Sequence, residues 1–200
     1  MNVYDFDKTI FQKDSSEAFL LYCLRRAPRM VIQPALPKLR LFLNYYTQGR
    51  EDASAIKEEL FAFLGTLGDL YGMLSDFWEE NFSLIKPWYL SQAKPDDIIV
   101  TASPDFLVRP AAEKLGVSLI ATPMDPFSGH ILGNNCHDKE KVRRFRLEYP
   151  DYAIDEFYSD SLSDTPLASI AARAFLVKGN ILLPWPSERR KHTRNASCLL

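Results

Sequence analysis

Apolar residues follow two different rhythms along the 200-residue chain. Short apolar runs typical of buried β-strands occur at the start and again from about residue 98 onward. Between them, residues 104–115, 139–148 and 164–172 have the composition of helices. Strands that alternate with helices indicate an α/β fold with a parallel sheet. The predicted strands cover residues 3–5, 98–101, 119–121, 156–158 and 175–177.

Residues 14–92 show almost no strand pattern and a strong helical periodicity. Its apolar residues form three sets at helical spacing, each of which predicts an apolar stripe along one helix. Asp52 caps the second stripe, and Pro34 and Pro37 open the third. The stripes consist of Leu67, Leu70, Tyr71, Leu74, Trp78 and Phe82, then Ile56, Leu60, Phe63 and Leu64, then Leu36, Leu39, Leu43 and Tyr46.

The two hydrophobic patterns together predict a helical block inserted after the first strand of an α/β core. We assign residues 1–13 and 93–186 to the core and residues 14–92 to the inserted block. Residues 187–200 are a basic segment without periodicity, which we expect to be a mobile tail.

Composition and charge narrow the function classes. The chain is 46% apolar and 25% charged, which excludes a disordered or fibrous protein. Its net charge of −2 gives no reason to expect a nucleic-acid partner. Three widely spaced cysteines argue against a disulfide framework and a structural zinc site. The first strand leaves no room for a secretory leader, and the longest apolar stretch holds two prolines and two cations, so we expect a cytoplasmic protein without a membrane span.

Carboxylates cluster where two predicted strands end. Asp5 and Asp7 are two residues apart and share a face, and Asp160 and Asp164 follow a later strand. Two carboxylates roughly 4 Å apart repel by about 4 kcal/mol at an effective dielectric of 20, so such a pair needs a cation or a proton. Because ligands of open α/β sheets bind at the carboxyl ends of the strands, these residues predict a site for a hard cation such as Mg²⁺.

Four motifs resemble those of the haloacid dehalogenase superfamily. They are Asp5-x-Asp7-x-Thr9, the strand end Thr101-Ala-Ser103-Pro104, a lysine at 141 and the Asp160/Asp164 pair. The resemblance covers about residues 1–12 and 95–180. The helical block resembles the small cap of the phosphoserine-phosphatase-like subfamily, so the resemblance implies a Rossmann-like core with an inserted helical cap.

The resemblance implies an Mg²⁺-dependent phosphatase that hydrolyses a small phosphate monoester through an aspartyl-phosphate. Asp5 would be the nucleophile, and Asp7 would protonate the leaving group and then activate water. Thr101 and Lys141 would neutralise the phosphoryl oxygens. The alternative is a non-catalytic relative that binds a phosphorylated ligand or regulates a partner, and an assay of Mg²⁺-dependent aryl phosphate hydrolysis distinguishes the two.

The resemblance also implies a metal site and its support. The Asp5 carboxylate, the Asp7 backbone carbonyl and Asp160 would hold Mg²⁺, while Asp164 would orient Lys141 or the metal's water ligands. Thr9 is assigned to substrate binding together with Ser103 and Asp14. Asp14 has the simpler reading of a helix N-cap for residues 15–25, and both roles are compatible.

Two choices and two departures from the family pattern stay open. Lys139 competes with Lys141, which we favour from its register, and Ser103 competes with Thr101, which we favour because it lies nearer the strand end. Asp138 stands three residues before Lys141, where the subfamily often has glycine. Ser159 stands before Asp160, where glycine is also common. The substrate and the oligomeric state are not predicted.

Overall fold

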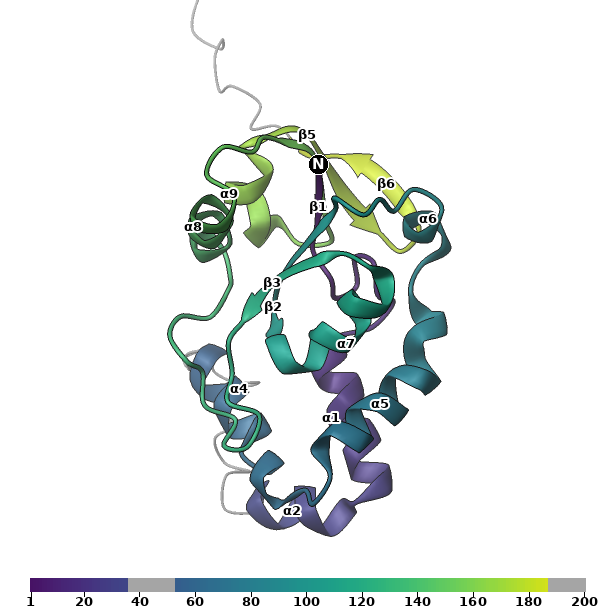
Figure 1. The fold of residues 1–200 in the computed structure, drawn as a ribbon, viewed down its shortest axis with the longest axis vertical. Coiled ribbons are helices and arrows are strands. Elements are labelled where there is room, and N and C mark those ends of the chain that lie inside the picture. Colours follow the sequence, from purple (N-terminus) through teal and green to yellow (C-terminus); the bar gives the residue numbers. More distant parts are fainter. Residues whose placement is uncertain (36–52, 187–200) are drawn as a thin grey trace, which may run out of the picture.

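A computed structural model describes residues 1–35 and 53–186 of the chain. Its centre is a six-stranded sheet in the order β3-β2-β1-β4-β5-β6, in which the first five strands are parallel and β6 is antiparallel to β5 (Figure 1). This confirms the predicted α/β class. The strands are β1 (Asn2–Tyr4), β2 (Ile98–Pro104), β3 (Ser118–Thr122), β4 (Ile154–Ser159), β5 (Ala171–Lys178) and β6 (Ile181–Pro184).

The last part of the sheet differs from the prediction. The predicted helix at residues 164–172 is wrong in its second half, because Ala171 onward pairs with β4 and only Thr165–Ala168 forms helix α9. Strand β6 was not predicted. It follows a tight turn in which Gly179 has a φ of +61°, a conformation that glycine adopts without strain.

Successive strand residues face two separate cores. Val3 packs with α8 (Lys139–Glu148) and α9 on one face of the sheet. Its neighbour Tyr4 packs on the other face with α7 (Asp105–Leu115) and with the helices of the inserted block. Both faces are therefore covered, as a parallel sheet requires, and the predicted helices at 104–115 and 139–148 are confirmed.

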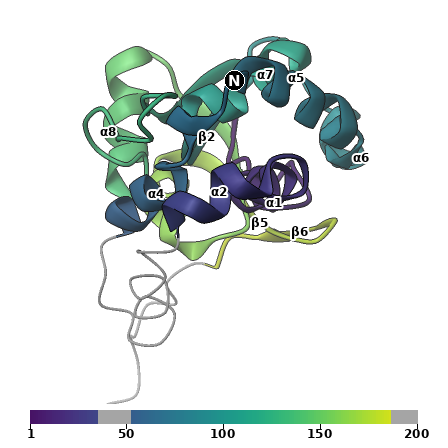
Figure 2. The same cartoon turned by 90° about the horizontal axis from the view of Figure 1, so that it is seen from below.

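The described part of the block between β1 and β2 consists of helices and connecting turns, as predicted, and adds no strand to the sheet beyond an isolated bridge of Ile85 with Phe11. Figure 1 shows α1, α2 and α4 gathered at the end of the molecule away from the N-terminus, and Figure 2 shows them in front when that end is viewed. The helices are α1 (Ser15–Arg26), α2 (Pro28–Ala35), α4 (Ala53–Phe61), α5 (Leu70–Asn81) and α6 (Pro87–Leu90), with 3₁₀ turns at Leu64–Thr66 and Phe82–Leu84.

The predicted stripe from residue 67 to 82 needs correction. The helix begins only at Leu70, because the Asp69 side chain caps it by accepting from the Gly72 N–H. Tyr71 is 61% exposed, whereas Phe77, which the stripe omitted, is fully buried. Pro34, which was predicted to open the stripe at residues 36–46, lies instead in the last turn of α2. That stripe with Pro37, the Asp52 cap and the basic tail lie outside the described residues.

Helix α5 joins the block to the sheet. Trp78 is buried, and its indole N–H donates to the Leu107 carbonyl of α7 at 2.7 Å. Its ring meets Phe6 and Phe11 edge-on, at centroid distances of 5.8 and 5.3 Å. One hydrophobic cluster thus runs from the inserted block into the core, and the division at residues 13/14 and 92/93 stays a prediction.

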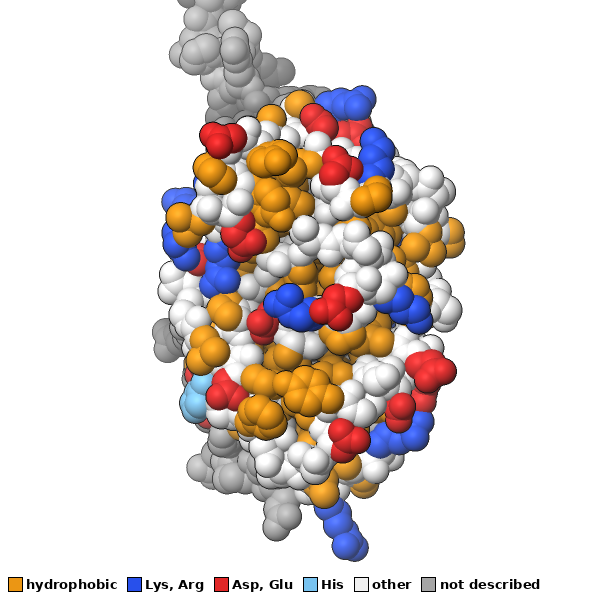
Figure 3. Space-filling view, viewed as in Figure 1, with side chains coloured by type: hydrophobic (Ala, Val, Ile, Leu, Met, Phe, Trp, Pro, Cys, Tyr) orange, Lys and Arg blue, Asp and Glu red, His pale blue; other side chains and the backbone are white. Residues whose placement is uncertain are grey.

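The surface mixes charges of both signs. On the face shown in Figure 3, acidic and basic side chains are interspersed among apolar ones without a large region of a single sign. Of the helices in residues 1–35 and 53–186, none combines the length and apolar character that crossing a bilayer demands.

Candidate active site

Asp5 lies directly after β1, where the strand's hydrogen bonding places its side chain at the carboxyl edge of the sheet. Its N–H donates to the Tyr158 carbonyl of β4 at 2.8 Å. Its Oδ1 accepts from the Lys141 ammonium at 2.7 Å and its Oδ2 from the Thr9 hydroxyl at 3.1 Å. Asp5 is 7% exposed, so its carboxylate is almost removed from bulk water and depends on these partners.

Lys141 reaches this carboxylate from the first turn of α8. Its ammonium also donates to Asp164 Oδ2 at 2.7 Å, and the side chain is 2% exposed. Lys139 is exposed, so the structure places Lys141 rather than Lys139 against Asp5. The Ser159 hydroxyl donates to the same oxygen of Asp164 at 2.7 Å. Lys141 is therefore held between two carboxylates, one of which is itself held by a serine.

Asp7 faces a second group of hydroxyls. Its Oδ1 accepts from the Ser15 N–H at 2.8 Å, and its Oδ2 accepts from the Ser103 hydroxyl. The Ser15 hydroxyl donates to Ser103 at 3.1 Å. Thr101 is buried and its hydroxyl accepts from the Ser103 N–H at 3.1 Å. Ser103 thus contacts Asp7 directly, while the choice between Thr101 and Ser103 as the phosphate contact stays a prediction.

Burial sets the protonation of these groups. Desolvation, opposed by Lys141, raises the pKa of Asp5 to about 6. Desolvation together with the nearby charge of Asp14 raises the pKa of Asp7 to about 7. Burial disfavours the Lys141 ammonium, but the Asp5 and Asp164 carboxylates outweigh it and raise the lysine's pKa. Near neutral pH the site therefore holds a mainly ionised Asp5, a charged lysine and an Asp7 that is present in both its protonated and its ionised form.

Thr9 links the two pairs of aspartates. It is fully buried, its hydroxyl accepts from the Asp160 N–H at 2.9 Å, and it lies 3.5 Å from Asp160 Oδ1 as well as 3.1 Å from Asp5 Oδ2. Asp160 has a raised pKa, chiefly because of desolvation. Thr9 therefore orients the acidic groups and has no exposed surface for a substrate.

The donor set fits Mg²⁺ through few protein ligands. Within the described ranges, no three acidic, histidine or cysteine side chains come close enough to hold a metal ion by themselves. Mg²⁺ needs only one or two carboxylates, with water and phosphate oxygens in its other positions. The carboxylates of Asp5 and Asp160, both beside Thr9, meet that need, and Asp164 Oδ1 is a buried oxygen without a partner among the residues described.

Asp14 occupies the N-terminus of α1. Its Oδ1 accepts from the Glu17 N–H at 3.1 Å, which is the helix-capping role predicted for it. Its Oδ2 lies 3.8 Å from the Lys8 ammonium. Both side chains help to line a groove of about 360 Å³ along α1 and α5. A substrate contact by Asp14 stays a prediction.

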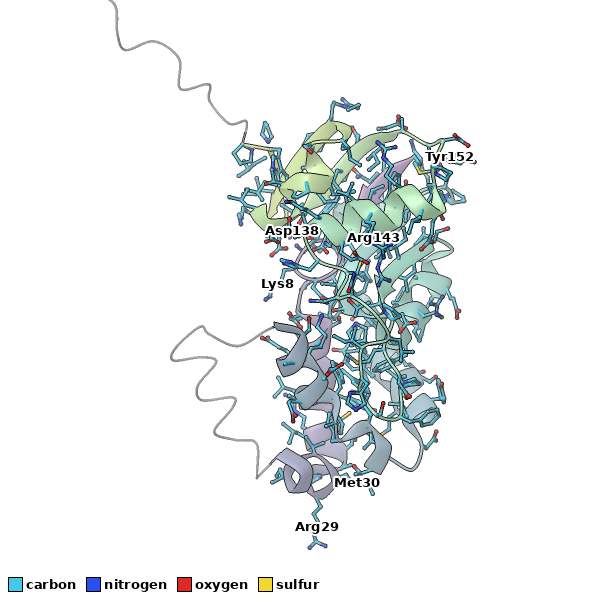
Figure 4. All side chains as sticks on the ribbon, turned by 90° about the vertical axis from the view of Figure 1, so that its left-hand side faces the viewer. Lys8, Arg29, Met30, Asp138, Arg143 and Tyr152 are labelled. Atoms are coloured by element: carbon cyan, nitrogen blue, oxygen red, sulfur yellow. The ribbon has the colours of Figure 1, made fainter. Side chains whose placement is uncertain are left out.

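Two non-glycine residues next to the site have positive φ. Lys8, between Asp7 and Thr9, has a φ of +56°, and Asp138 has a φ of +53° with a ψ of −124°. Figure 4 shows both on the same edge of the molecule, where the sheet gives way to the helical block. The buried Lys86 ammonium donates to the Lys8 carbonyl and to the Gly179 carbonyl, which holds the loop after Asp7 in place.

The sequence did not indicate several residues that the structure brings to the site. Ser15 and Ser159 bind the aspartates, and the only signal for Ser159 was its place where relatives have glycine. Lys57 of α4 donates to the Ala102 carbonyl at 2.6 Å and to Asn135 Oδ1 at 2.8 Å. In the sequence it reads as one more solvated lysine of a helix, so no local signal could have identified it.

Comparisons with known proteins agree with this geometry. A family model described as haloacid dehalogenase-like hydrolase matches residues 3–169. Protein CicA of Caulobacter vibrioides is 34% identical over 186 aligned residues, which cover 84% of this chain and 81% of that protein.

Solved structures share the fold. A protein of unknown function from Bordetella pertussis Tohama I has a TM-score of 0.74 at 21% identity and covers 87% of each chain. A phosphoserine phosphohydrolase-like protein from Francisella tularensis has a TM-score of 0.53 at 17% identity, with 87% of this chain and 86% of that chain covered. Since the family model spans most of the chain and the similarity to CicA extends over most of both lengths, the chain belongs to the haloacid dehalogenase-like hydrolases.

Proposed function

We propose that this protein is an Mg²⁺-dependent phosphatase that hydrolyses a small phosphate monoester through an aspartyl-phosphate on Asp5. One observation carries the proposal: the Asp5 carboxylate and the Lys141 ammonium lie 2.7 Å apart at the carboxyl edge of the sheet, two residues from the half-buried Asp7. A nucleophile, a cation for the phosphoryl group and an acid with a pKa of about 7 are the parts that such a reaction needs.

Asp5 is suited to the nucleophilic step. Its pKa of about 6 leaves it mainly ionised near neutral pH, so a carboxylate oxygen can attack phosphorus. The new bond joins that oxygen to phosphorus, and the bond from phosphorus to the leaving oxygen breaks. Lys141, which already donates to Asp5, offsets the negative charge of the phosphoryl oxygens during the transfer.

Asp7 is suited to move the proton. With a pKa of about 7, it can give a proton to the leaving oxygen and then accept one from the water that attacks the aspartyl-phosphate. The second step releases inorganic phosphate and restores the Asp5 carboxylate. Ser15 and Ser103 hold the two oxygens of Asp7, which fixes the direction of its remaining lone pairs.

The remaining residues hold and neutralise the phosphate and the metal. Thr101 would donate its hydroxyl proton to a phosphoryl oxygen, with Ser103 as the alternative donor. The Asp5 and Asp160 carboxylates and the Asp7 backbone carbonyl would hold Mg²⁺, which supplies positive charge against the phosphoryl group. We further propose a small phosphorylated metabolite as substrate and the cytoplasm as the place of action.

The test compares p-nitrophenyl phosphate hydrolysis by wild type, Asp5→Asn, Asp7→Asn and the exposed control Asp151→Asn. The wild type and the control should turn over only with Mg²⁺, Asp5→Asn should lose more than about 10³-fold in kcat, and Asp7→Asn about 10²-fold or more. Cooperative thermal unfolding of each variant, with a melting temperature not below that of wild type, establishes that the variants fold. Wild-type turnover by Asp5→Asn contradicts the proposal, and inactivity of the wild type across a panel of phosphorylated metabolites favours the non-catalytic alternative.

A further inference from the structure

Lys57 connects the inserted helical block to two segments of the core. It lies in the middle of α4, and its ammonium donates to the Ala102 carbonyl at 2.6 Å and to Asn135 Oδ1 at 2.8 Å. The neighbouring Glu58 attaches the same helix to the core, because its Oε1 accepts from the Ile131 N–H at 2.7 Å. Two successive residues of α4 thus bind strand β2 and the segment at residues 131–135 that follows β3.

The two acceptors of Lys57 belong to segments that carry site residues. Ala102 stands between Thr101 and Ser103, and Asn135 precedes the turn that leads into α8 and Lys141. The Thr122 hydroxyl lies 2.7 Å from the Ala102 carbonyl and 2.9 Å from Asn135 Oδ1.

Thr122 extends this network to the next residue of the loop. The Cys136 N–H donates to the Thr122 hydroxyl at 2.9 Å. The Lys57 ammonium therefore completes a polar network of four segments, three from the sheet edge and one from the helical block.

The charge of Lys57 is costly where it lies. Desolvation lowers the pKa of Lys57 to about 8, whereas the charges of Asp7, Asp14 and Cys136 raise it and that of Lys141 lowers it. Both of its described hydrogen-bond acceptors are neutral oxygens. The carboxylates of Asp7 and Asp14 make no described hydrogen bond with the ammonium and offset the desolvation only in part. An apolar side chain would fill the same space at lower cost, which indicates that the ammonium is kept for its hydrogen bonds.

We propose that Lys57 is a positioning residue, which fixes the Thr101–Ser103 segment relative to the segment that aims Lys141. Its effect on turnover rests on the proposed phosphatase function. Lys57 acts through Ala102 and Asn135 and not by touching the substrate, so it governs the alignment of the phosphate contacts and not the binding of the rest of the substrate.

The kinetic test uses Lys57→Met, Lys57→Arg and Lys114→Met, an exposed lysine of α7, as the matched control. With p-nitrophenyl phosphate and Mg²⁺, Lys57→Met should lower kcat at least about 10-fold and leave KM within about 3-fold, since misplaced catalytic groups cost rate. Lys57→Arg, which keeps the charge and several donors, should recover most of kcat. Unchanged kcat in Lys57→Met, or a rise in KM alone, overturns the proposal.

The pH dependence gives a signature that loss of packing does not produce. The kcat ratio of wild type to Lys57→Met should be constant below about pH 7.5 and shrink above pH 8, because the wild-type lysine loses its charge there. With Lys57→Arg in place of wild type, the ratio should stay constant to pH 9. A wild-type ratio that is constant throughout contradicts a role for the ammonium.

Hydrogen exchange separates this proposal from the proposed function. If the wild type proves inactive, the phosphatase assignment fails, but the network is still tested by amide exchange in residues 134–138. Exchange there should accelerate in Lys57→Met and not in Lys57→Arg or Lys114→Met, and unchanged exchange overturns the proposal. If Lys57→Met does not fold, Asn135→Ala tests the same network by removing one acceptor of Lys57. Faster amide exchange in that variant supports the proposal, and unchanged exchange overturns it.

Discussion

Asp138 is held in a backbone conformation that costs energy at a position where relatives often have glycine. Its φ of +53° and ψ of −124° lie outside the left-handed helical region, and only glycine is relaxed there. Its carbonyl accepts from the Lys141 N–H at 3.2 Å, so the strained residue begins the turn that carries the lysine. The sequence showed the departure from the family pattern, and the structure shows that it is a matter of backbone strain.

Asp138→Gly is therefore expected to stabilise the protein. Relief of about 1–3 kcal/mol of strain, less about 0.5–1 kcal/mol for the greater freedom of glycine in the unfolded chain, leaves a gain on the order of 1 kcal/mol. The melting temperature should rise by about 2–4 °C. Asp151→Gly, at an exposed turn with ordinary φ, should lower it, and a lower melting temperature for Asp138→Gly would show that the conformation is not strained.

Ser159 is the second departure from the family pattern, and its hydroxyl has a structural partner. It donates to Asp164 Oδ2, the oxygen that also accepts from Lys141. Ser159→Ala should destabilise the protein by about 1–2 kcal/mol, because a hydrogen bond to a buried carboxylate is lost. The turnover of p-nitrophenyl phosphate should fall less than 10-fold, since Lys141 keeps its bond to Asp5. Chemical denaturation measures the first effect, with Ser169→Ala as an exposed control that should unfold like wild type.

At the scale of elements, the spacing of apolar residues predicted the helices that bury one regular face. It missed the helix start that a single polar cap determines. Helices α7 and α8 were predicted to within one residue because each buries a single continuous face. The stripe through α5 began too early, because the Asp69 cap starts the helix at Leu70. It is confirmed for the buried Leu70, Leu74 and Trp78, but it missed the buried Phe77 and included the exposed Tyr71. The predicted helix at 164–172 extended too far because residues from Ala171 onward form β5 by pairing with β4, and the local sequence does not encode that pairing.

Trp78 tests how α5 is attached to the core. Trp78→Phe keeps an aromatic ring but removes the hydrogen bond to the Leu107 carbonyl and leaves a small cavity, so it should cost about 2 kcal/mol. This corresponds to a fall in melting temperature of about 4–8 °C. Tyr71→Phe, on the exposed side of the same helix, should change the stability by less than about 0.5 kcal/mol. Equal melting temperatures of the two variants would show that α5 is not anchored through this indole.

At the scale of the whole molecule, the chain brings its site together from segments that are far apart in sequence. Asp5 meets Lys141 across 136 positions, and Asp160 meets Thr9 across 151. The motifs predicted which residues gather, because parallel strands end at one edge of the sheet. They could not predict how the aspartates are linked. Thr9 lies between Asp5 and Asp160, and Lys141 lies between Asp5 and Asp164, while no three described acidic side chains surround a common metal position. This arrangement depends on side-chain geometry between distant segments.

The buried aspartates make the stability of the whole protein depend on pH. In the folded state Asp5 and Asp7 keep their protons up to about pH 6 and pH 7, whereas the unfolded chain releases them near pH 3.8. Between these values the folded state binds more protons, so stability falls as pH rises. Glu140, whose pKa the hydrogen bond from Arg143 lowers to about 2, acts in the opposite direction but only below pH 4.5. Lys57, whose pKa burial lowers to about 8, also makes the stability rise with pH, but only above pH 8.

In buffer with a chelator, these two shifts amount to about 4 kcal/mol between pH 5 and pH 8, so the melting temperature should drop by roughly 10 °C over this range. Asp7→Asn removes the group with the higher of the two raised pKa values and should flatten much of this slope, whereas Asp151→Asn should leave it unchanged. Mg²⁺ should raise the melting temperature more at pH 8 than at pH 5, because at low pH it competes with protons for the same carboxylates. A melting temperature that is constant or rises over this range without metal would mean that the aspartates are not desolvated as the structure places them. A Mg²⁺ effect that is independent of pH would mean that Asp5 is not a ligand of the metal.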